Sequence, residues 1–134
     1  GLKPLARIVS GGESSRIMLA IKTALGQADE TPTLIFDEID TGVGGSVADA
    51  IGQRLSLLSK RVQVISVTHA PQVAARADTH FLISKSGGTE RVSTGIAEMD
   101  RGARQEEIAR MLAGATITDE ARAAANRLLS ENAV

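Results

Sequence analysis

Residues 33–45 read TLIFDEIDTGVGG, a short apolar run that ends abruptly in two adjacent carboxylates, Asp37 and Glu38. Such a run is typical of a buried strand, and a strand's period of two would direct the two acids to opposite faces. Because open α/β folds bind ligands at the carboxyl ends of their strands, both acids are candidate site residues. The pattern also fits a strand that ends in a solvated acidic turn, and taken alone it favours this simpler interpretation.

The two carboxylates suit different chemical tasks. Asp37 could hold a hard cation such as Mg²⁺, which prefers oxygen ligands, and Glu38 could orient or deprotonate a water molecule. Just beyond them the sequence predicts a mobile or tightly turned loop that contains Asp40, Gly42, Gly44 and Gly45.

A second candidate site lies upstream, where Ser10-Gly11-Gly12-Glu13 precedes a predicted helix over residues 14–25. Serine and glutamate at this spacing form a capping box, which would explain both residues without any function. The two glycines support another interpretation, because they let backbone N–H groups at a helix N-terminus approach an anion such as phosphate. Both interpretations stay open on these residues alone.

His69 follows a second apolar run, residues 62–67. The nearly continuous apolar character predicts a parallel strand that is buried on both faces. A lone histidine is more often structural than catalytic, but His69 would share an edge with Asp37 and Glu38 if the two strands are parallel neighbours. His80 has no such neighbours in the sequence, and we expect it to be structural.

The rest of the pattern predicts supporting elements. Ser46 and Asp49 stand at capping-box spacing at the start of an amphipathic helix that ends at Leu58. The further elements expected are a hairpin with strands at 81–84 and 92–96 around Ser86-Gly87-Gly88, and helices at 103–113 and 119–131. The fold class is therefore α/β, a mostly parallel sheet flanked by helices, with a terminal hairpin and two C-terminal helices.

Composition narrows the possible functions. The 134 residues, 43% hydrophobic and 23% charged, fit one soluble domain or part of one. The absence of cysteine excludes disulfides and thiolate metal sites, and no apolar run is long enough for a membrane span, so we expect a cytoplasmic protein without membrane contact. A net charge of −1 and only two aromatic residues do not make a nucleic-acid surface, so any DNA contact must be local or lie elsewhere.

Four features occur in order along the chain: a glycine-rich capped helix, an acidic strand end, an Asp-Thr-Gly turn, and a strand followed by histidine. Together they resemble the ABC-type ATPases. In that resemblance Ser10-Gly11-Gly12-Glu13 corresponds to the signature motif and residues 34–38 to the Walker B strand, which ends in the catalytic glutamate. Asp40-Thr41-Gly42 corresponds to the D-loop and His69 to the switch histidine.

The sequences of longer segments make the resemblance more specific. VSGGESSRIMLAIK, TLIFDEIDTGVGG, VTHAPQVAARAD, EEIARMLAG and ITDEARAAANRLL together are similar to the C-terminal part of the SMC-like ATPases of bacterial DNA double-strand break repair. The resemblance spans nearly the whole chain. It implies that residues 1–134 form the C-terminal lobe of an ABC/SMC-type P-loop ATPase head, in a cytoplasmic, nucleoid-associated protein.

The resemblance also implies ligands, roles and partners. ATP and Mg²⁺ are the expected cofactors: Asp37 would hold Mg²⁺ through water, Glu38 and His69 would be catalytic, and Ser10 to Glu13 would contact, in trans, the nucleotide of a second head. The implied partners are an N-terminal Walker A lobe of the same protein, a second head in a homodimer, and DNA through the full-length protein. The phosphate-binding pattern G-x-x-x-x-G-K-[ST] does not occur in the sequence, so we expect the isolated chain to be inactive.

Two alternative functions remain open. The chain could be part of the nucleotide-binding domain of an ABC transporter; heptad repeats upstream of Gly1 would argue against this, and a compact helical insert would argue for it. It could also be a non-catalytic ATP-dependent clamp, which the intact acidic pair and His69 disfavour.

Overall fold

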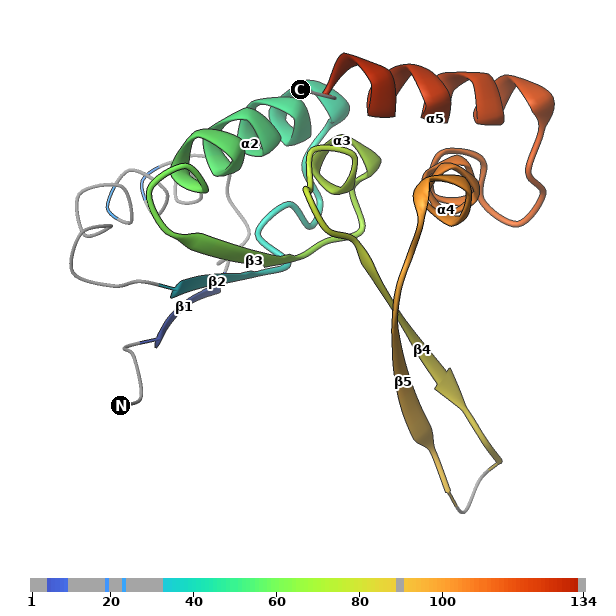
Figure 1. Ribbon diagram of the computed structural model, residues 1–134, viewed down its shortest axis with the longest axis horizontal. Helices are drawn as coiled ribbons and strands as arrows, with labels where there is room; N and C mark the ends of the chain where they lie inside the picture. Colours follow the sequence, from blue (N-terminus) through green and yellow to red (C-terminus); the bar gives the residue numbers. More distant parts are fainter. Residues whose placement is uncertain (1–4, 10–18, 20–22, 24–32, 89–90, 133–134) are drawn as a thin grey trace. The chain divides into compact units, whose positions relative to one another are not determined.

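The computed structural model describes residues 5–9, 19, 23, 33–88 and 91–132. The chain forms two compact units, Gly1–Arg76 and Ala77–Val134. In the first unit the described elements are strands β1 (Leu5–Val9), β2 (Thr33–Asp37) and β3 (Gln63–Val67) and helices α2 (Gly45–Leu58) and α3 (Pro71–Ala74) (Figure 1). Those of the second are strands β4 (Phe81–Ser86) and β5 (Ser93–Glu98) and helices α4 (Arg101–Ala113) and α5 (Asp119–Glu131). The α/β class is confirmed.

The three strands of the first unit form a parallel sheet with β2 in the centre. Val9, Asp37 and Val67 are partners across the sheet, so all three strands end at the same edge. The strand before His69 is therefore a parallel neighbour of the strand that ends at Asp37. This is the arrangement under which we expected His69 to share an edge with Asp37 and Glu38.

One face of the sheet packs against α2, which lies along it in Figure 1. Alternation along β2 directs Leu34 and Phe36, 1% and 0% exposed, to this face. There they join apolar residues of the stripe predicted for the helix, with the buried members Ile51, Leu55 and Leu58. Burial of these large side chains is the main favourable contribution to the stability of the unit.

The opposite face of β3 is open in the described part of the chain. Ile65 is 44% exposed and Val67 37% exposed, so the prediction of a strand buried on both faces is wrong here. The reason is that α2 covers only the face that carries Val64, and strand alternation directs Ile65 and Val67 to the other face.

The start of α2 also differs from the sequence prediction. The helix begins at Gly45 with Gly44 as its N-cap, and no side chain caps it. Val43, directly before the N-cap, packs against the core, and the helix therefore starts one residue before Ser46. Asp49 is therefore not part of a capping box, and its carboxylate accepts hydrogen bonds from Gln53 and Arg76, each at 3.3 Å.

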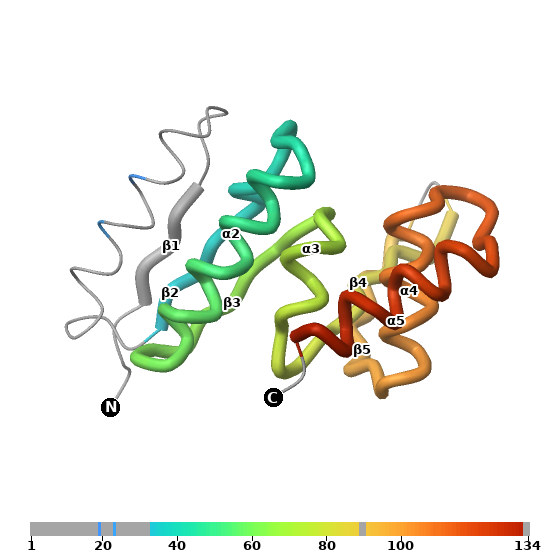
Figure 2. Tube along the Cα trace, turned by 90° about the horizontal axis from the view of Figure 1, so that it is seen from above, coloured from blue at the N-terminus to red at the C-terminus, as the bar shows by residue number. Residues whose placement is uncertain are grey.

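The short helix α3 was not predicted. Pro71 occupies its first turn, where a missing N–H costs nothing. Gly52 of α2 lets α3 approach closely, because a Cβ atom at position 52 would lie 3.1 Å from the carbonyl oxygen of Gln72. Figure 2 shows the two helices side by side.

The second unit contains the predicted hairpin, longer than expected. β4 and β5 are antiparallel from the pair Phe81 and Glu98 to the pair Ser86 and Ser93. All residues of both strands are exposed, and one face carries Phe81, Ile83 and Ile96. The backbone N–H of Met99 donates to the carbonyl oxygen of His80 at 2.9 Å and extends the pairing toward the helices.

The two C-terminal helices are confirmed, with α4 starting two residues earlier than predicted. Asp100 caps α4 by accepting a hydrogen bond from the Ala103 N–H at 2.9 Å, and Gly114 ends it with a positive φ of 81°. The helices bury a small apolar seam of Ile108, Ala109, Ala121, Ala125 and Leu129. None of the helices in the described ranges is long and apolar enough to cross a membrane.

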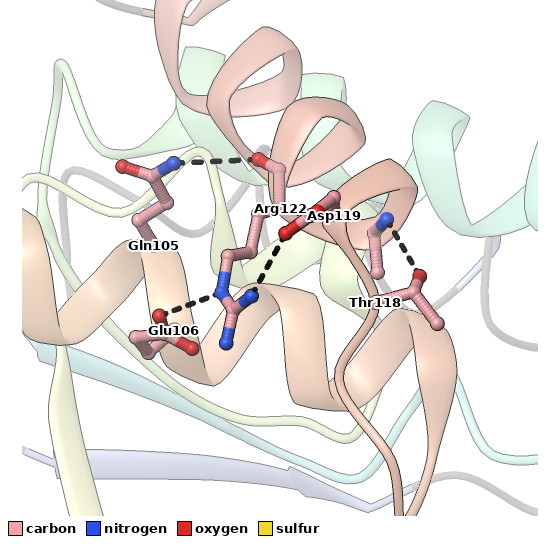
Figure 3. A network of polar contacts seen from close by, with 6 residues as sticks. Gln105, Glu106, Thr118, Asp119 and Arg122 are labelled. Atoms are coloured by element: carbon pink, nitrogen blue, oxygen red, sulfur yellow. Dashed lines mark hydrogen bonds and ion pairs between the residues drawn. The ribbon is translucent and has the colours of Figure 1, made fainter.

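Polar contacts at the start of α5 also join the two helices (Figure 3). The Arg122 guanidinium donates to Glu106 at 2.9 Å and to Asp119 at 3.1 Å, while Gln105 donates to the Arg122 carbonyl oxygen at 3.4 Å. Thr118 caps α5 by accepting from the Ala121 N–H at 3.1 Å. Of these contacts, the Arg122–Glu106 pair and the Gln105 hydrogen bond join the two helices, and both add to the packing of the apolar seam.

His80 lies in a partly buried position that favours its neutral form. Burial lowers the pKa of His80 below its ordinary value of 6.5, the Arg104 guanidinium lowers it further, and Glu107 partly opposes the shift. The unfolded chain therefore binds more protons than the folded chain just below this pH, and stability falls as pH falls through that range.

We predict that the free energy of unfolding of the chain decreases between about pH 7.5 and about pH 5.5, and that His80→Gln weakens this dependence. Urea denaturation at the two pH values measures both slopes. The depressed pKa of Glu107 affects stability only below its ordinary value of 4.5, outside this window. Identical slopes for the two proteins would show that His80 is not the group responsible.

Candidate functional site

The carboxyl edge of the parallel sheet brings together polar residues from two strands. Asp37 is the last residue of β2 and the partner of Val67 in β3. The next backbone N–H, that of Glu38, donates to the Val67 carbonyl oxygen at 2.8 Å. The ladder thus extends one residue past the strand and holds Glu38 beside the segment that begins at Thr68.

Glu38 and His69 meet at this edge. His69 Nε2 lies 3.0 Å from Glu38 Oε1, and the tautomer with its proton on Nε2 donates a hydrogen bond to the carboxylate. The two side chains are 83% and 49% exposed for His69 and Glu38, respectively. Such exposed pairs contribute at most about 1 kcal/mol to stability, so this contact adds little to the stability of the fold. Because both side chains are exposed, they are accessible to a ligand.

Glu38 has an unusual backbone conformation. Its φ of +55° is the only positive value at a residue other than glycine within the described ranges. A left-handed conformation costs an L-residue about 1–2 kcal/mol. Two features maintain it here: the hydrogen bond from the Glu38 N–H to Val67, and the burial of Ile39, which is 2% exposed. Conformational strain of this kind is typical of functional sites.

The residues after Glu38 form a tight turn, the second of the two alternatives predicted for this loop. The Thr41 N–H donates to the Glu38 carbonyl oxygen at 3.3 Å, and Gly42 has a φ of +78°, which glycine adopts without strain. Asp40 is 6% exposed, and its Oδ2 accepts a hydrogen bond from the Thr68 hydroxyl. The turn is therefore anchored, through a buried carboxylate, to the residue that follows β3.

The sequence-predicted residues fall into three groups, of which the structure describes two. It brings Glu38 and His69 into contact, with Asp37 adjacent in the chain. It places Asp40, Thr41 and Gly42 together in the turn. The third group, Ser10 with Gly11, Gly12 and Glu13, lies outside the described residues, directly after β1 in the sequence. The functional roles assigned to all of these residues remain predictions.

The described residues do not form a complete cage for a metal ion. No group of three or more His, Asp or Glu side chains among them is arranged to hold one. Asp37, which is partly buried at the sheet edge, could hold an ion there through its water shell. This suits Mg²⁺, which is commonly bound through one or two carboxylates, water and substrate phosphates.

Sequence reasoning missed the contributions of Thr68 and Ile39. Thr68 could have been noticed because a threonine hydroxyl often accepts a hydrogen bond from the backbone N–H two residues further on and so closes a local turn. Here the Ala70 N–H donates to the Thr68 hydroxyl at 2.9 Å. Ile39 is an apolar residue between two acids, a sign that the loop is tied to the core. The pairing of Thr68 with Asp40 joins residues that are 28 positions apart, which no local pattern reveals.

Curated proteins named DNA repair protein RecN are similar to this chain over nearly its whole length. The protein from Xylella fastidiosa (strain Temecula1) is 51% identical over 129 residues, which cover 96% of this chain and 23% of that protein. The proteins from Treponema pallidum and Halalkalibacterium halodurans are each 47% identical, over 98% and 96% of this chain and 23% of each relative. The chain thus spans about a quarter of the length of these relatives. No family model matches it.

Solved structures of SMC head domains share the fold. The SMC head domain from Thermotoga maritima has a TM-score of 0.55 and 19% identity, over 65% of this chain and 32% of that one. A chain from work on ATP-driven dimerization and DNA-stimulated activation of SMC ATPases has a TM-score of 0.55 and 23% identity, over 72% and 58%. The resemblance to SMC-like proteins of bacterial DNA repair is thereby confirmed.

The strain at Glu38 gives a testable prediction. Glu38→Gly and Glu38→Ala both remove the contact with His69, but only glycine adopts a positive φ freely, so the glycine variant should be more stable by about 1 kcal/mol. The free energies of unfolding of both variants follow from urea titration. At Arg54, an exposed position inside α2, the order should reverse, with alanine the more stable. A more stable alanine variant at both positions would mean that Glu38 is not held in the left-handed conformation.

Proposed function

Because this chain is similar to RecN over nearly its whole length, we propose that residues 1–134 are the C-terminal lobe of the ATP-hydrolysing head of an SMC-like DNA repair protein. In the full-length protein, ATP would drive two heads together, and this dimerisation would be coupled to repair of DNA double-strand breaks. Similarity to relatives named for DNA repair supports the biological role, and similarity to SMC heads supports the fold.

The contact between Glu38 and His69 is the observation that carries the proposed chemistry. It unites, at the carboxyl edge of a parallel sheet and 3.0 Å apart, a carboxylate and an imidazole that come from neighbouring strands. ATP hydrolysis needs a group that orients the attacking water and donors that stabilise charge on the γ-phosphate. These two side chains provide one of each.

The site residues fit ATP with Mg²⁺. Asp37 would hold the ion through its water shell, and the bound ion would neutralise charge on the β- and γ-phosphates. The single carboxylate, in place of a cage, leaves room for water and phosphate oxygens among the ligands of the ion.

Glu38 and His69 would act in turn. His69 can give its Nε2 proton in a hydrogen bond either to Glu38 or to a γ-phosphate oxygen. When it turns to the phosphate, the Glu38 carboxylate is released to accept a hydrogen bond from the attacking water and to remove its proton. His69 would thus sense the γ-phosphate and free the catalytic glutamate in one movement.

The remaining motifs would act across a dimer of heads. Ser10 and the N–H groups of Gly11 and Gly12, followed by Glu13, would stabilise phosphate charge on the ATP of the second head. The loop that cradles that ATP would belong to an N-terminal Walker A lobe. Asp40, Thr41 and Gly42 would lie between the two sites. DNA would be engaged through other parts of the full-length protein, since this chain has a net charge of −1.

Two other functions use the same motifs. A transporter domain is the weaker candidate, because the relatives reported above are repair proteins. A non-catalytic clamp would bind ATP and dimerise without hydrolysis. ATP hydrolysis by the full-length wild-type protein separates the ATPase from the clamp, and the glutamine variant of Glu38 then tests the catalytic residue.

We predict that Glu38→Gln in the full-length protein keeps ATP binding and lowers the hydrolysis rate by about 100-fold or more, because the amide keeps the shape but cannot accept the proton. Size-exclusion chromatography with ATP should then show a persistent dimer. Glu98→Gln, at an exposed position of β5, is the matched control and should behave like wild type. Hydrolysis by Glu38→Gln at the wild-type rate would assign the base to another residue.

A mixing experiment tests the trans role of Ser10. Full-length Ser10→Arg should bind ATP and fail to hydrolyse it, because the arginine would fill the space of the opposite γ-phosphate. A variant without the Walker A lysine should also be inactive alone. Their heterodimer contains one site with both defects and one with neither, so mixing should restore part of the ATPase activity. If Ser10 only caps a helix, Ser10→Arg loses about 1 kcal/mol of stability and stays active.

A further inference from the structure

The hydroxyl group of Thr68 connects two loops of the candidate site. Thr68 Oγ1 donates a hydrogen bond to Asp40 Oδ2 and accepts one from the backbone N–H of Ala70 at 2.9 Å. A hydroxyl can donate one bond and accept others, so the two contacts are compatible. The first contact anchors the turn after β2, and the second closes a local turn around His69.

The buried Asp40 carboxylate makes this hydroxyl difficult to replace. Asp40 is 6% exposed, and a carboxylate with so little access to water depends on hydrogen-bond donors in the protein. Valine has nearly the shape of threonine without the hydroxyl. At position 68 it would leave both the carboxylate oxygen and the Ala70 N–H without this partner.

The contact also lies beside the catalytic pair. Residues 38–40 and 67–69 are joined at three places: from the Glu38 N–H to the Val67 carbonyl oxygen at 2.8 Å, from Thr68 to Asp40, and from His69 to Glu38 at 3.0 Å. The Glu38–Val67 contact is a backbone hydrogen bond and the Thr68–Asp40 contact ends on a buried carboxylate, whereas the Glu38–His69 contact is exposed. A shift of the Asp40 turn would pull on Thr68 and therefore on its neighbour His69.

We propose that Thr68 is a positioning residue that couples the Asp40 turn to His69, so that the imidazole and Glu38 stay aligned on one γ-phosphate. This inference rests on the proposed ATPase function. It assigns Asp40 a role inside its own chain: contact of a second head with the turn at Asp40 to Gly42 would reach His69 through the Thr68 hydroxyl, in addition to the contacts that Glu38 makes.

The test is steady-state ATP hydrolysis by the full-length protein. Thr68→Val is expected to lower kcat about tenfold and to change the KM for ATP by less than about twofold, because alignment and not binding is lost. Thr68→Ser keeps the hydroxyl and should retain kcat within about twofold of wild type. Thr33→Val is the matched control, since the Thr33 hydroxyl bonds Gln63 at the opposite end of β2, and it should leave both parameters unchanged.

A double variant protects the test against simple unfolding. Thr68→Val leaves a buried carboxylate unpaired, whereas Thr68→Val with Asp40→Ala removes both polar partners and is expected to fold. If the two residues act through each other, kcat of the double variant is no lower than that of the more impaired single variant. Losses that multiply would overturn the coupling, and so would a wild-type kcat in the double variant.

The outcomes separate this inference from the proposed function. A wild-type protein without ATPase activity would overturn both. If wild type hydrolyses ATP and Glu38→Gln does not, but Thr68→Val keeps the wild-type kcat, then the coupling by Thr68 alone is overturned. A higher KM with an unchanged kcat would also overturn it, because that pattern indicates a loss of uniform binding.

Discussion

The parallel pairing of β2 with β3 is the interaction on which the candidate site depends. It sets Asp37 opposite Val67 and continues one step further, where the Glu38 N–H bonds the Val67 carbonyl oxygen. A shift of one residue in this register would move side chains to opposite faces of the sheet and separate Glu38 from His69. The core on the α2 side opposes such a shift, since Leu34 and Phe36 of β2 and Val64 of β3 all pack in it.

Local stability and the geometry of the site are in conflict at two neighbouring positions. Glu38 is held in a left-handed conformation, and Asp40 carries a carboxylate into a position that is 6% exposed. Both arrangements cost free energy unless their surroundings compensate, whereas burial of Ile39 between them is itself favourable. Compensation comes from the ladder bond to Val67, the apolar core around Ile39 and the Thr68 hydroxyl, all outside the DEID tetrapeptide.

The sequence predicts those parts of the structure that depend on local patterns. The apolar run before Asp37, the glycine that ends α4 and the acids that open α5 each identify an element from adjacent residues. The meeting of Glu38 with His69 also follows, once both strands are taken to be parallel. Solvent exposure is harder to predict: the apolar run of β3 does not reveal that one face is open, because that depends on which elements cover the sheet. The Thr68–Asp40 bond is harder still, since threonine and aspartate carry no period that links positions 28 residues apart.

The three acids of the DEID segment differ in environment more than in chemistry. Asp37 ends a strand and is partly buried, Glu38 is half exposed and in contact with an imidazole, and Asp40 is enclosed and hydrogen-bonded to a hydroxyl. A carboxylate near water and phosphate can bind an ion or a water molecule, whereas an enclosed one serves best as a fixed acceptor. The direction in which the backbone turns after β2 therefore gives three nearly identical groups three different environments. Glu38, with its positive φ, lies at that change of direction, between the strand that ends with Asp37 and the turn that carries the enclosed Asp40.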